Sequence, residues 1–192
     1  MTPRLTLASR SPQRRAILDQ LGIDFEVVEP SGVEEATEGE PQWLVAENAR
    51  RKARSVDAER VLGVDTDVFL EGRVFGKPAD RDSAASMLLA LSGRTHQVWS
   101  GIALREGGAE RASVACTKVR FARVSEQLLD WYLASEEWKG RAGGYAIQGR
   151  GAALVEAIEG DFWNVVGLPV PDLLELAPDL FRPRPWAPPA GS

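Results

Sequence analysis

The apolar run VLGVDTDVFL, residues 61–70, constrains the fold more than any other stretch of this chain. Such a run is typical of a strand buried on both faces, in a sheet that helices cover. It predicts one long strand or a pair of strands. Asp65 interrupts the run, and it is either buried and paired or placed at the C-terminal end of a strand, where α/β sheets bind ligands. Two interpretations stay open: a turn residue that ends the strand, or a metal ligand or general base. Asp67 falls on the same face, nearer solvent.

Strands and helices alternate before this run, and strands pair after it, which predicts an α/β fold with a mixed sheet. The polar turn REGGAER, residues 105–111, indicates a hairpin, and the glycine-rich segment 141–170 holds two further strand-like runs. The predicted strands cover residues 4–8, 24–28, 97–104 and 113–121, and the predicted helices cover residues 11–21, 43–56, 80–91, 125–135 and 172–176.

The length of 192 residues fits one domain, or two small lobes around one core. Residues 30–41 have almost no apolar content and predict a loop. We expect a single domain over residues 1–181. The proline-rich remainder, residues 182–192, predicts a disordered tail.

Composition excludes several classes of protein. The net charge of -5 and pI of about 5.1 give no overall basic field to hold nucleic acid or anionic lipid. No apolar run has transmembrane length, and no signal peptide is recognisable, so we expect a soluble cytoplasmic protein without membrane or nucleic-acid partners.

One cysteine, Cys116, and one histidine, His96, leave no zinc cluster. A metal would be held by carboxylates and water, which points to Mg²⁺ or Mn²⁺. For His96 we expect a structural hydrogen bond.

The stretch LASRSPQRR, residues 7–15, places two arginines at the start of a predicted helix. Ser11 is a good helix N-cap and Pro12 suits the first helical position. Arg14 and Arg15 then fall in the first turn, where the helix dipole disfavours cations. Either the two charges are tolerated there or an anion binds beside them, and we expect Arg15 to face solvent.

Other polar residues each leave a plain and a functional interpretation open. Glu35 lies in an acidic loop that is either solvated or joins Asp65 in holding a hard cation. Lys52 lies on a basic helix face. Lys77, in FGKP, is a surface lysine or a point charge on a phosphate, because the spacing does not match a Walker A loop. Gln148 lies between glycines, either solvated in a turn or paired with the edge of a base.

The order of the motifs is more specific than any one of them. The chain carries LASRSP.RR, VEE, a helix with K-A, GVDTDV, GKP.D, ML..LSG..H, AGGYAIQG and GDFWNVVGLP in succession. This succession resembles the Maf family of nucleoside triphosphate pyrophosphatases, within the wider inosine-triphosphatase-like fold. The resemblance covers about residues 4–176.

The resemblance implies an elongated mixed sheet flanked by helices, with two lobes around a deep cleft. It implies metal-dependent cleavage of nucleoside triphosphates between the α and β phosphates, which gives the monophosphate and pyrophosphate. It also implies a homodimer and a role in removing surplus or non-canonical nucleotides.

The resemblance also implies residue roles. Asp65 matches the general base, or the carboxylate that orients metal and water, and Glu35 matches a metal-binding or assisting carboxylate. Which of the two accepts the proton stays open. Thr66 and Gln148 match positions tied to the choice of base. The matches to triphosphate-binding positions are Ser9, Arg14, Lys52 and Lys77, with both lysines counted as catalytic.

The subgroup with Asp-Thr and Tyr-x-Ile-Gln-Gly, here at residues 65–66 and 145–149, is similar to dTTP/UTP pyrophosphatases. The chain departs from the usual Ser-Pro-Arg-Arg at Gln13, a position linked to substrate choice, and has Trp163 where Tyr is common. Gln13 keeps open the same reaction on another base, such as CTP, 7-methyl-GTP or a modified nucleotide. A further alternative is a nucleotide-binding regulator of cell division with little turnover.

Overall fold

The computed structural model describes residues 3–182, whose strands form one mixed sheet covered by helices. The strands are β1 (Leu5–Ala8), β2 (Phe25–Val28), β3 (Arg60–Leu70), β4 (Arg73–Phe75), β5 (Thr95–Glu106), β6 (Ala109–Phe121) and β7 (Val155–Glu159). The α-helices are α1 (Pro12–Gln20), α2 (Pro41–Arg54), α3 (Arg81–Leu91), α4 (Glu126–Leu133), α5 (Phe162–Val166) and α6 (Val170–Leu176). Three 3₁₀ turns, η1 (Ala142–Gly144), η2 (Arg150–Leu154) and η3 (Pro178–Phe181), complete the described elements.

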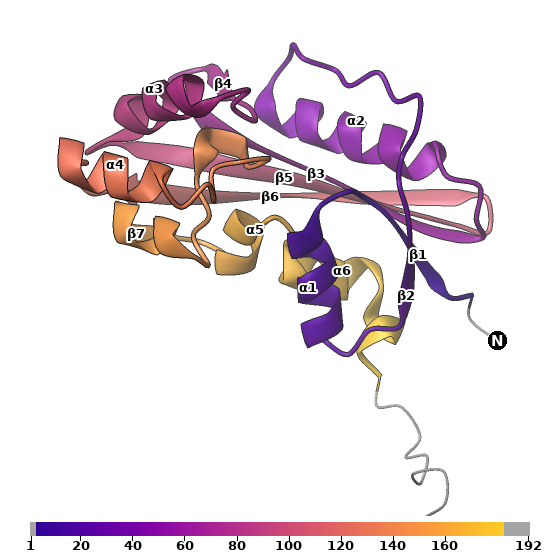
Figure 1. Ribbon diagram of the computed structural model, residues 1–192. Coiled ribbons are helices and arrows are strands. Elements are labelled where there is room, and N and C mark those ends of the chain that lie inside the picture. Colours follow the sequence, from indigo (N-terminus) through magenta and orange to yellow (C-terminus); the bar gives the residue numbers. More distant parts are fainter. Residues whose placement is uncertain (1–2, 183–192) are drawn as a thin grey trace, which may run out of the picture.

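The sheet has the order β2-β1-β3-β5-β6-β7, and the short β4 also pairs with β3. Both β2 and β3 run parallel to β1, whereas β4 and β5 run antiparallel to β3. Figure 1 shows the long strands as an elongated axis, with α2 along one face, α1 and α6 toward one end, and α3 and α4 toward the other. The predicted α/β class with a mixed sheet is confirmed.

The run at residues 61–70 forms one long strand, β3, and not a strand pair. The hairpin that follows is confirmed, but its turn was predicted too wide. Only Gly107 and Gly108 turn the chain, and both have positive φ (57° and 81°), which two-residue hairpin turns of the primed type require. The flanking polar residues pair instead, with Glu106 opposite Ala109.

Only one of the two strand-like runs in residues 141–170 forms a strand, β7. The side chain of Asp161 accepts hydrogen bonds from the backbone N–H groups of Trp163 and Asn164, so it caps the short helix α5. The next helix, α6, begins at Val170, two residues before its predicted start. Apart from Arg182, the predicted tail lies outside the described residues.

Two apolar clusters lie at opposite ends of β3. Leu62 and Val64 pack with residues of α1 and α6, whereas Val68 and Leu70 pack with residues of α3 and α4. The polar residues 65–67 of β3 lie between these clusters. The chain is therefore built as two lobes that share β3, and the carboxylates fall at the junction.

Helix α2 covers the opposite face of β3 and β5 at very short range. A Cβ built on Gly63 would lie 2.1 Å from the backbone oxygen of Ala49, and one on Gly101 would lie 2.3 Å from that of Val45. A contact shorter than 3 Å of this kind requires the backbone to shift. Glycine at both positions is therefore what lets α2 lie directly on the sheet.

His96 has the structural role that we expected. Its Nε2 atom lies 2.9 Å from the hydroxyl oxygen of Tyr145, inside the lobe that contains α3 and α4. Burial lowers the pKa of His96 to about 4, so its ring is neutral near pH 7. Among the described helices, none has both the length and the apolar character of a membrane span.

The substitution Gly63→Ala tests the contact between α2 and the sheet. We expect it to lower the free energy of unfolding by about 3 kcal/mol, because the added methyl group forces α2 outward. Gly76→Ala is the matched control, since a Cβ there meets nothing within 4 Å. Denaturant unfolding of both variants measures the difference, and equal, small losses would show that α2 is not held at this distance.

Candidate active site

The edge of β3 is uncovered at the carboxylates. Strand β1 pairs with β3 only as far as Gly63, and β4 begins to pair only at Val68. Within the described chain, residues 64–67 therefore have no partner strand on this side. The segment after β1, which carries Ser9, and the loop after β4, which carries Lys77, flank the opening. A ligand can thus approach β3 along its edge.

Lys52 joins the two predicted carboxylates. Its Nζ atom lies 2.5 Å from Oδ1 of Asp65 and 2.6 Å from Oε1 of Glu35. Asp65 is buried in β3, with 6% of its surface exposed, whereas 54% of the Glu35 side chain is exposed. Asp65 is therefore buried and paired. It is not a turn residue that ends the strand, because β3 continues past it.

Asn48 is a residue of this site that sequence reasoning missed. Its side chain is buried and makes two bonds to Ala36: Oδ1 accepts from the backbone N–H at 2.7 Å, and Nδ2 donates to the carbonyl at 3.0 Å. Nδ2 also donates to Oδ2 of Asp65 at 3.3 Å. Asn48 thereby fastens the segment that carries Glu35, which has no regular secondary structure, to the strand that carries Asp65.

Asp67 adds a third acidic group on the face of β3 that carries Asp65. Its partial exposure, against the burial of Asp65, agrees with the expectation that it lies nearer solvent. Burial, and next the charge of Asp65, raise the pKa of Asp67 to about 7. Near neutral pH this carboxyl is therefore only partly ionised.

Arg14 makes three hydrogen bonds to segments that lie far apart in the chain. Its Nε donates to the carbonyl of Gly167 at 2.8 Å, and its two Nη atoms donate to the hydroxyls of Ser9 and Thr66, each at 3.1 Å. Burial lowers the pKa of Arg14, against the attraction of Asp65. The positive charge of Arg14 is thus disfavoured by burial, and its compensation by a bound anion stays a prediction. Three of its five N–H groups already have acceptors, and two are left for a ligand.

Arg15 does not simply face solvent either. Its side chain is 39% exposed and reaches Glu29 at 4.0 Å, while its Nε atom is buried without a partner among the described residues.

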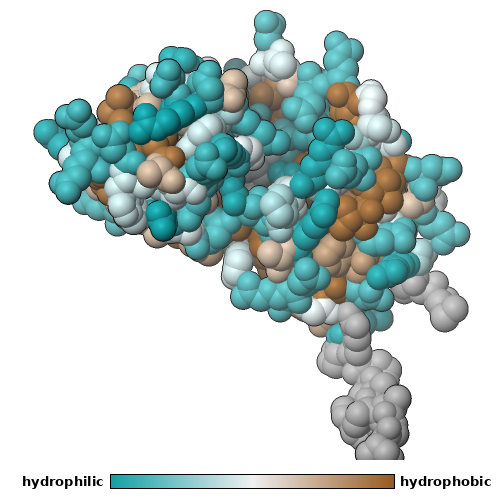
Figure 2. Space-filling model, viewed as in Figure 1, coloured by the Kyte–Doolittle hydropathy of each residue, from teal (hydrophilic) through white to brown (hydrophobic). Residues whose placement is uncertain are grey.

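Two adjoining cavities collect the predicted residues. One has a volume of about 220 Å³ and the other about 360 Å³, and Arg14 and Lys77 line both. Figure 2 shows the surface hollowed between the two halves of the molecule, with hydrophilic side chains around the hollow. The smaller cavity is also lined by Ser9, Glu35 and Lys52, and the larger one by Gln13, Thr66 and Gln148. Asp65 lies beside them through its contact with Lys52.

The positive charges around the cavities suit a polyanion. Burial, and next the charges of Arg14 and Lys52, lower the pKa of Lys77. No ion pair of Lys77 occurs among the described residues. An anion in the cavity would supply the negative charge that Lys77 lacks.

The donor set suits a hard divalent cation that shares its coordination with a ligand. Asp65 and Glu35 supply carboxylate oxygens, which Mg²⁺ prefers. No group of three histidine, cysteine or acidic side chains in residues 3–182 is arranged to enclose a metal alone. Phosphate oxygens and water would have to complete the shell, as is usual for Mg²⁺.

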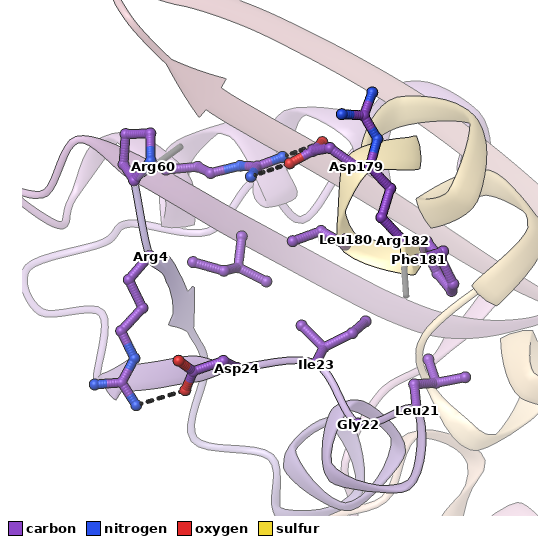
Figure 3. Close-up of a pocket in the computed structure, with 12 residues that line it drawn as sticks. Arg4, Leu21, Gly22, Ile23, Asp24, Arg60, Asp179, Leu180, Phe181 and Arg182 are labelled. Carbon is purple, nitrogen blue, oxygen red and sulfur yellow. Dashed lines mark hydrogen bonds and ion pairs between the residues drawn. The ribbon is translucent and has the colours of Figure 1, made fainter. Parts of the chain in front are cut away.

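A larger hollow, about 710 Å³, lies elsewhere, between the start of β1 and η3. Figure 3 shows two pairs of charged groups in it, Arg60 with Asp179 and Arg4 with Asp24, and also Arg182 without a dashed line to any of them. The buried Arg60 makes two bonds to Asp179, at 2.6 and 2.7 Å, and so ties η3 to β3. We assign this hollow a structural role, because its rim lacks the lysine-bridged carboxylates.

Residues 4–180 match the family described as Maf-like protein. The chain belongs to this family. It is 45% identical over 197 residues to a "dTTP/UTP pyrophosphatase" of Anaeromyxobacter sp. (strain Fw109-5), covering all of this chain and 96% of that protein. Proteins of the same name from Symbiobacterium thermophilum and Pyrococcus furiosus are 48% and 41% identical, over 87% and 90% of this chain and 89% and 93% of their own lengths.

The substitution Asn48→Leu tests whether Asn48 holds the Glu35 segment. We expect hydrogen exchange at the Ala36 amide to accelerate at least about tenfold, because a buried hydrogen bond contributes about 1 kcal/mol or more. We also expect weaker binding of Mg²⁺, measured by calorimetry.

Gln42→Leu is the matched control, since Gln42 is an exposed amide side chain on the same helix. Unchanged exchange at Ala36 in Asn48→Leu would mean that other contacts fix this segment.

Proposed function

We propose that this protein hydrolyses dTTP and UTP to the monophosphate and pyrophosphate. The observation that supports this most directly is the Lys52-bridged pair Asp65 and Glu35 at the mouth of a cation-lined cavity. The relatives named dTTP/UTP pyrophosphatase over nearly the whole chain supply the substrate class.

Asp65 accepts the proton of the attacking water in this proposal. Its burial and its contacts with Lys52 and Asn48 fix both carboxylate oxygens, so it can orient a water at the α-phosphorus. Glu35 is more exposed and reaches the opening of the cavity. We therefore give Glu35 the assisting and metal-binding role.

The cofactor in this proposal is Mg²⁺ or Mn²⁺, held by Asp65 and Glu35. When bound, such an ion neutralises phosphate charge and lowers the pKa of a coordinated water. Lys52 orients both carboxylates toward it. This choice of metal agrees with the carboxylate oxygens that Asp65 and Glu35 supply.

The phosphates lie along the smaller cavity in this proposal, where Ser9, Arg14 and Lys77 meet. The hydroxyl of Ser9 and the two remaining N–H groups of Arg14 donate to phosphate oxygens. Lys77 stabilises the negative charge that develops on the pyrophosphate leaving group. No step requires a covalent intermediate.

The larger cavity takes the nucleoside. Gln13, Thr66 and Gln148 line it, and an amide can pair with the edge of a pyrimidine. Gln13 replaces an arginine of the usual family motif, and its Oε1 is 3.0 Å from the hydroxyl of Ser11. Gln13 therefore supports a second candidate function, which is the same reaction on CTP or a modified nucleotide.

We assign the protein a role in removing surplus or non-canonical nucleotides in the cytoplasm. A homodimer stays a prediction from the family resemblance. A regulator with little turnover is the competing function, and a lack of catalysis would favour it.

A panel of nucleoside triphosphates with Mg²⁺ or Mn²⁺ tests the proposed reaction, with pyrophosphate and orthophosphate assayed separately. We expect pyrophosphate from dTTP and UTP in preference to other nucleotides. Orthophosphate as the only product would contradict cleavage between the α and β phosphates. Binding of nucleotides with no product would favour the regulator.

The substitution Asp65→Asn tests the proposed base. We expect kcat to fall by about 10²–10⁴-fold, because an amide cannot accept the proton of water. Asp130→Asn is the matched control, since Asp130 is an exposed residue paired with Arg81. Retained kcat in Asp65→Asn would assign the base elsewhere.

A further inference from the structure

The wall of the larger cavity is rich in hydrogen-bond donors. Five of the described residues that line it carry positive charge, and none of the described lining residues is Asp or Glu. An ammonium or guanidinium group can only donate hydrogen bonds. The cavity therefore favours a ligand that presents acceptor oxygens. The five cations are Arg10, Arg14, Lys77, Lys139 and Arg141.

Arg141, like Lys77, has no fixed acceptor among the described residues. Arg10 pairs with Glu29 at 3.3 Å, Arg14 makes its three hydrogen bonds, and Lys139 pairs with Glu136 at 2.7 Å. Among the described residues, the guanidinium of Arg141 makes no ion pair or hydrogen bond, although it is partly buried. Its donors are thus free for a ligand in the cavity.

Arg141 also lies away from the reacting end. The pKa values of Arg14 and Lys77 respond to Asp65 and Glu35, whereas the groups whose charge acts on Arg141 are Tyr132 and Glu137. Arg141 lines the larger cavity but not the smaller one, where Glu35 and Lys52 lie. A substrate with its phosphates beside the carboxylates would direct its nucleoside, and not its phosphates, toward Arg141.

Uracil and thymine carry two carbonyl oxygens, whereas cytosine carries an amino group in place of one of them. A guanidinium that faces this position pairs with the carbonyl and leaves the amino group without an acceptor. A site built around one such donor discriminates strongly, because the wrong partner leaves polar groups unpaired.

We propose that Arg141 is a specificity-determining residue, which donates a hydrogen bond to the base carbonyl that cytosine lacks. This inference rests on the proposed function for the placement of the nucleoside. It adds the selection of keto pyrimidines over amino pyrimidines and assigns that selection to one side chain.

The test measures the binding of UMP, CMP and pyrophosphate to the intact protein by calorimetry with Mg²⁺ present. The variants are Arg141→Met, which removes the donors, and Arg141→Lys, which keeps one charged donor. Arg150→Met is the matched control, because Arg150 lies over the ring of Trp131, 5.5 Å from its centroid, and does not line the cavity.

We expect Arg141→Met to weaken UMP binding by about 10–100-fold and CMP binding much less, since a charge-assisted hydrogen bond is lost only with UMP. Pyrophosphate binding should change by no more than about twofold, and Arg141→Lys should restore part of the UMP preference. Equal weakening of UMP and CMP, weakening of pyrophosphate to the same degree, or no change in UMP binding would each overturn the inference.

These measurements need no turnover, so they separate the inference from the proposed reaction. A wild-type protein that releases no pyrophosphate, yet binds UMP in a manner that depends on Arg141, would contradict the reaction and support the inference. If the wild-type protein releases pyrophosphate and Arg141→Met keeps the preference for UMP over CMP, the reaction is supported and the inference is contradicted.

Discussion

The direct contact between α2 and the sheet is the constraint on which the candidate site depends. Gly63 and Gly101 leave room for the helix backbone against β3 and β5. At this distance Lys52 reaches Asp65 at 2.5 Å and Asn48 reaches it at 3.3 Å. If α2 were displaced outward by the width of one methyl group, the Lys52–Asp65 and Asn48–Asp65 contacts would both lengthen. The glycines of the sheet thus set the geometry of the carboxylates.

The interruption of the sheet edge turns this buried cluster into an accessible one. Where β1 has stopped pairing at Gly63 and β4 has yet to start at Val68, Thr66 and Asp67 are partly exposed, while Asp65 is buried. The apolar clusters at the two ends of β3 hold the lobes in place. Arg14 spans the opening, from Ser9 to Gly167, and so connects the two sides of the cavity.

The sequence allowed most of the site to be predicted, because its residues fall in short motifs whose order is specific. The predicted residues other than Asp65 line two adjoining cavities, and Asp65 contacts Lys52 beside them. Asn48 was missed because an asparagine in a basic helix carries no periodic signal, and its partner Ala36 lies in a segment without regular structure. The acceptors of Arg14 could not be foreseen either, since Gly167 is 153 residues away in the chain. Only one of the two strand-like runs in residues 141–170 forms a strand, because Asp161 caps a helix over the apolar residues that follow it.

Hydrolysis of UTP in ¹⁸O-labelled water is the measurement that tests the central claim most directly, because it shows which phosphorus the water attacks. With Asp65 and Glu35 beside the α-phosphorus, the account predicts the label in UMP and none in pyrophosphate. Label in pyrophosphate or in orthophosphate would place the attack on another phosphorus and contradict the account.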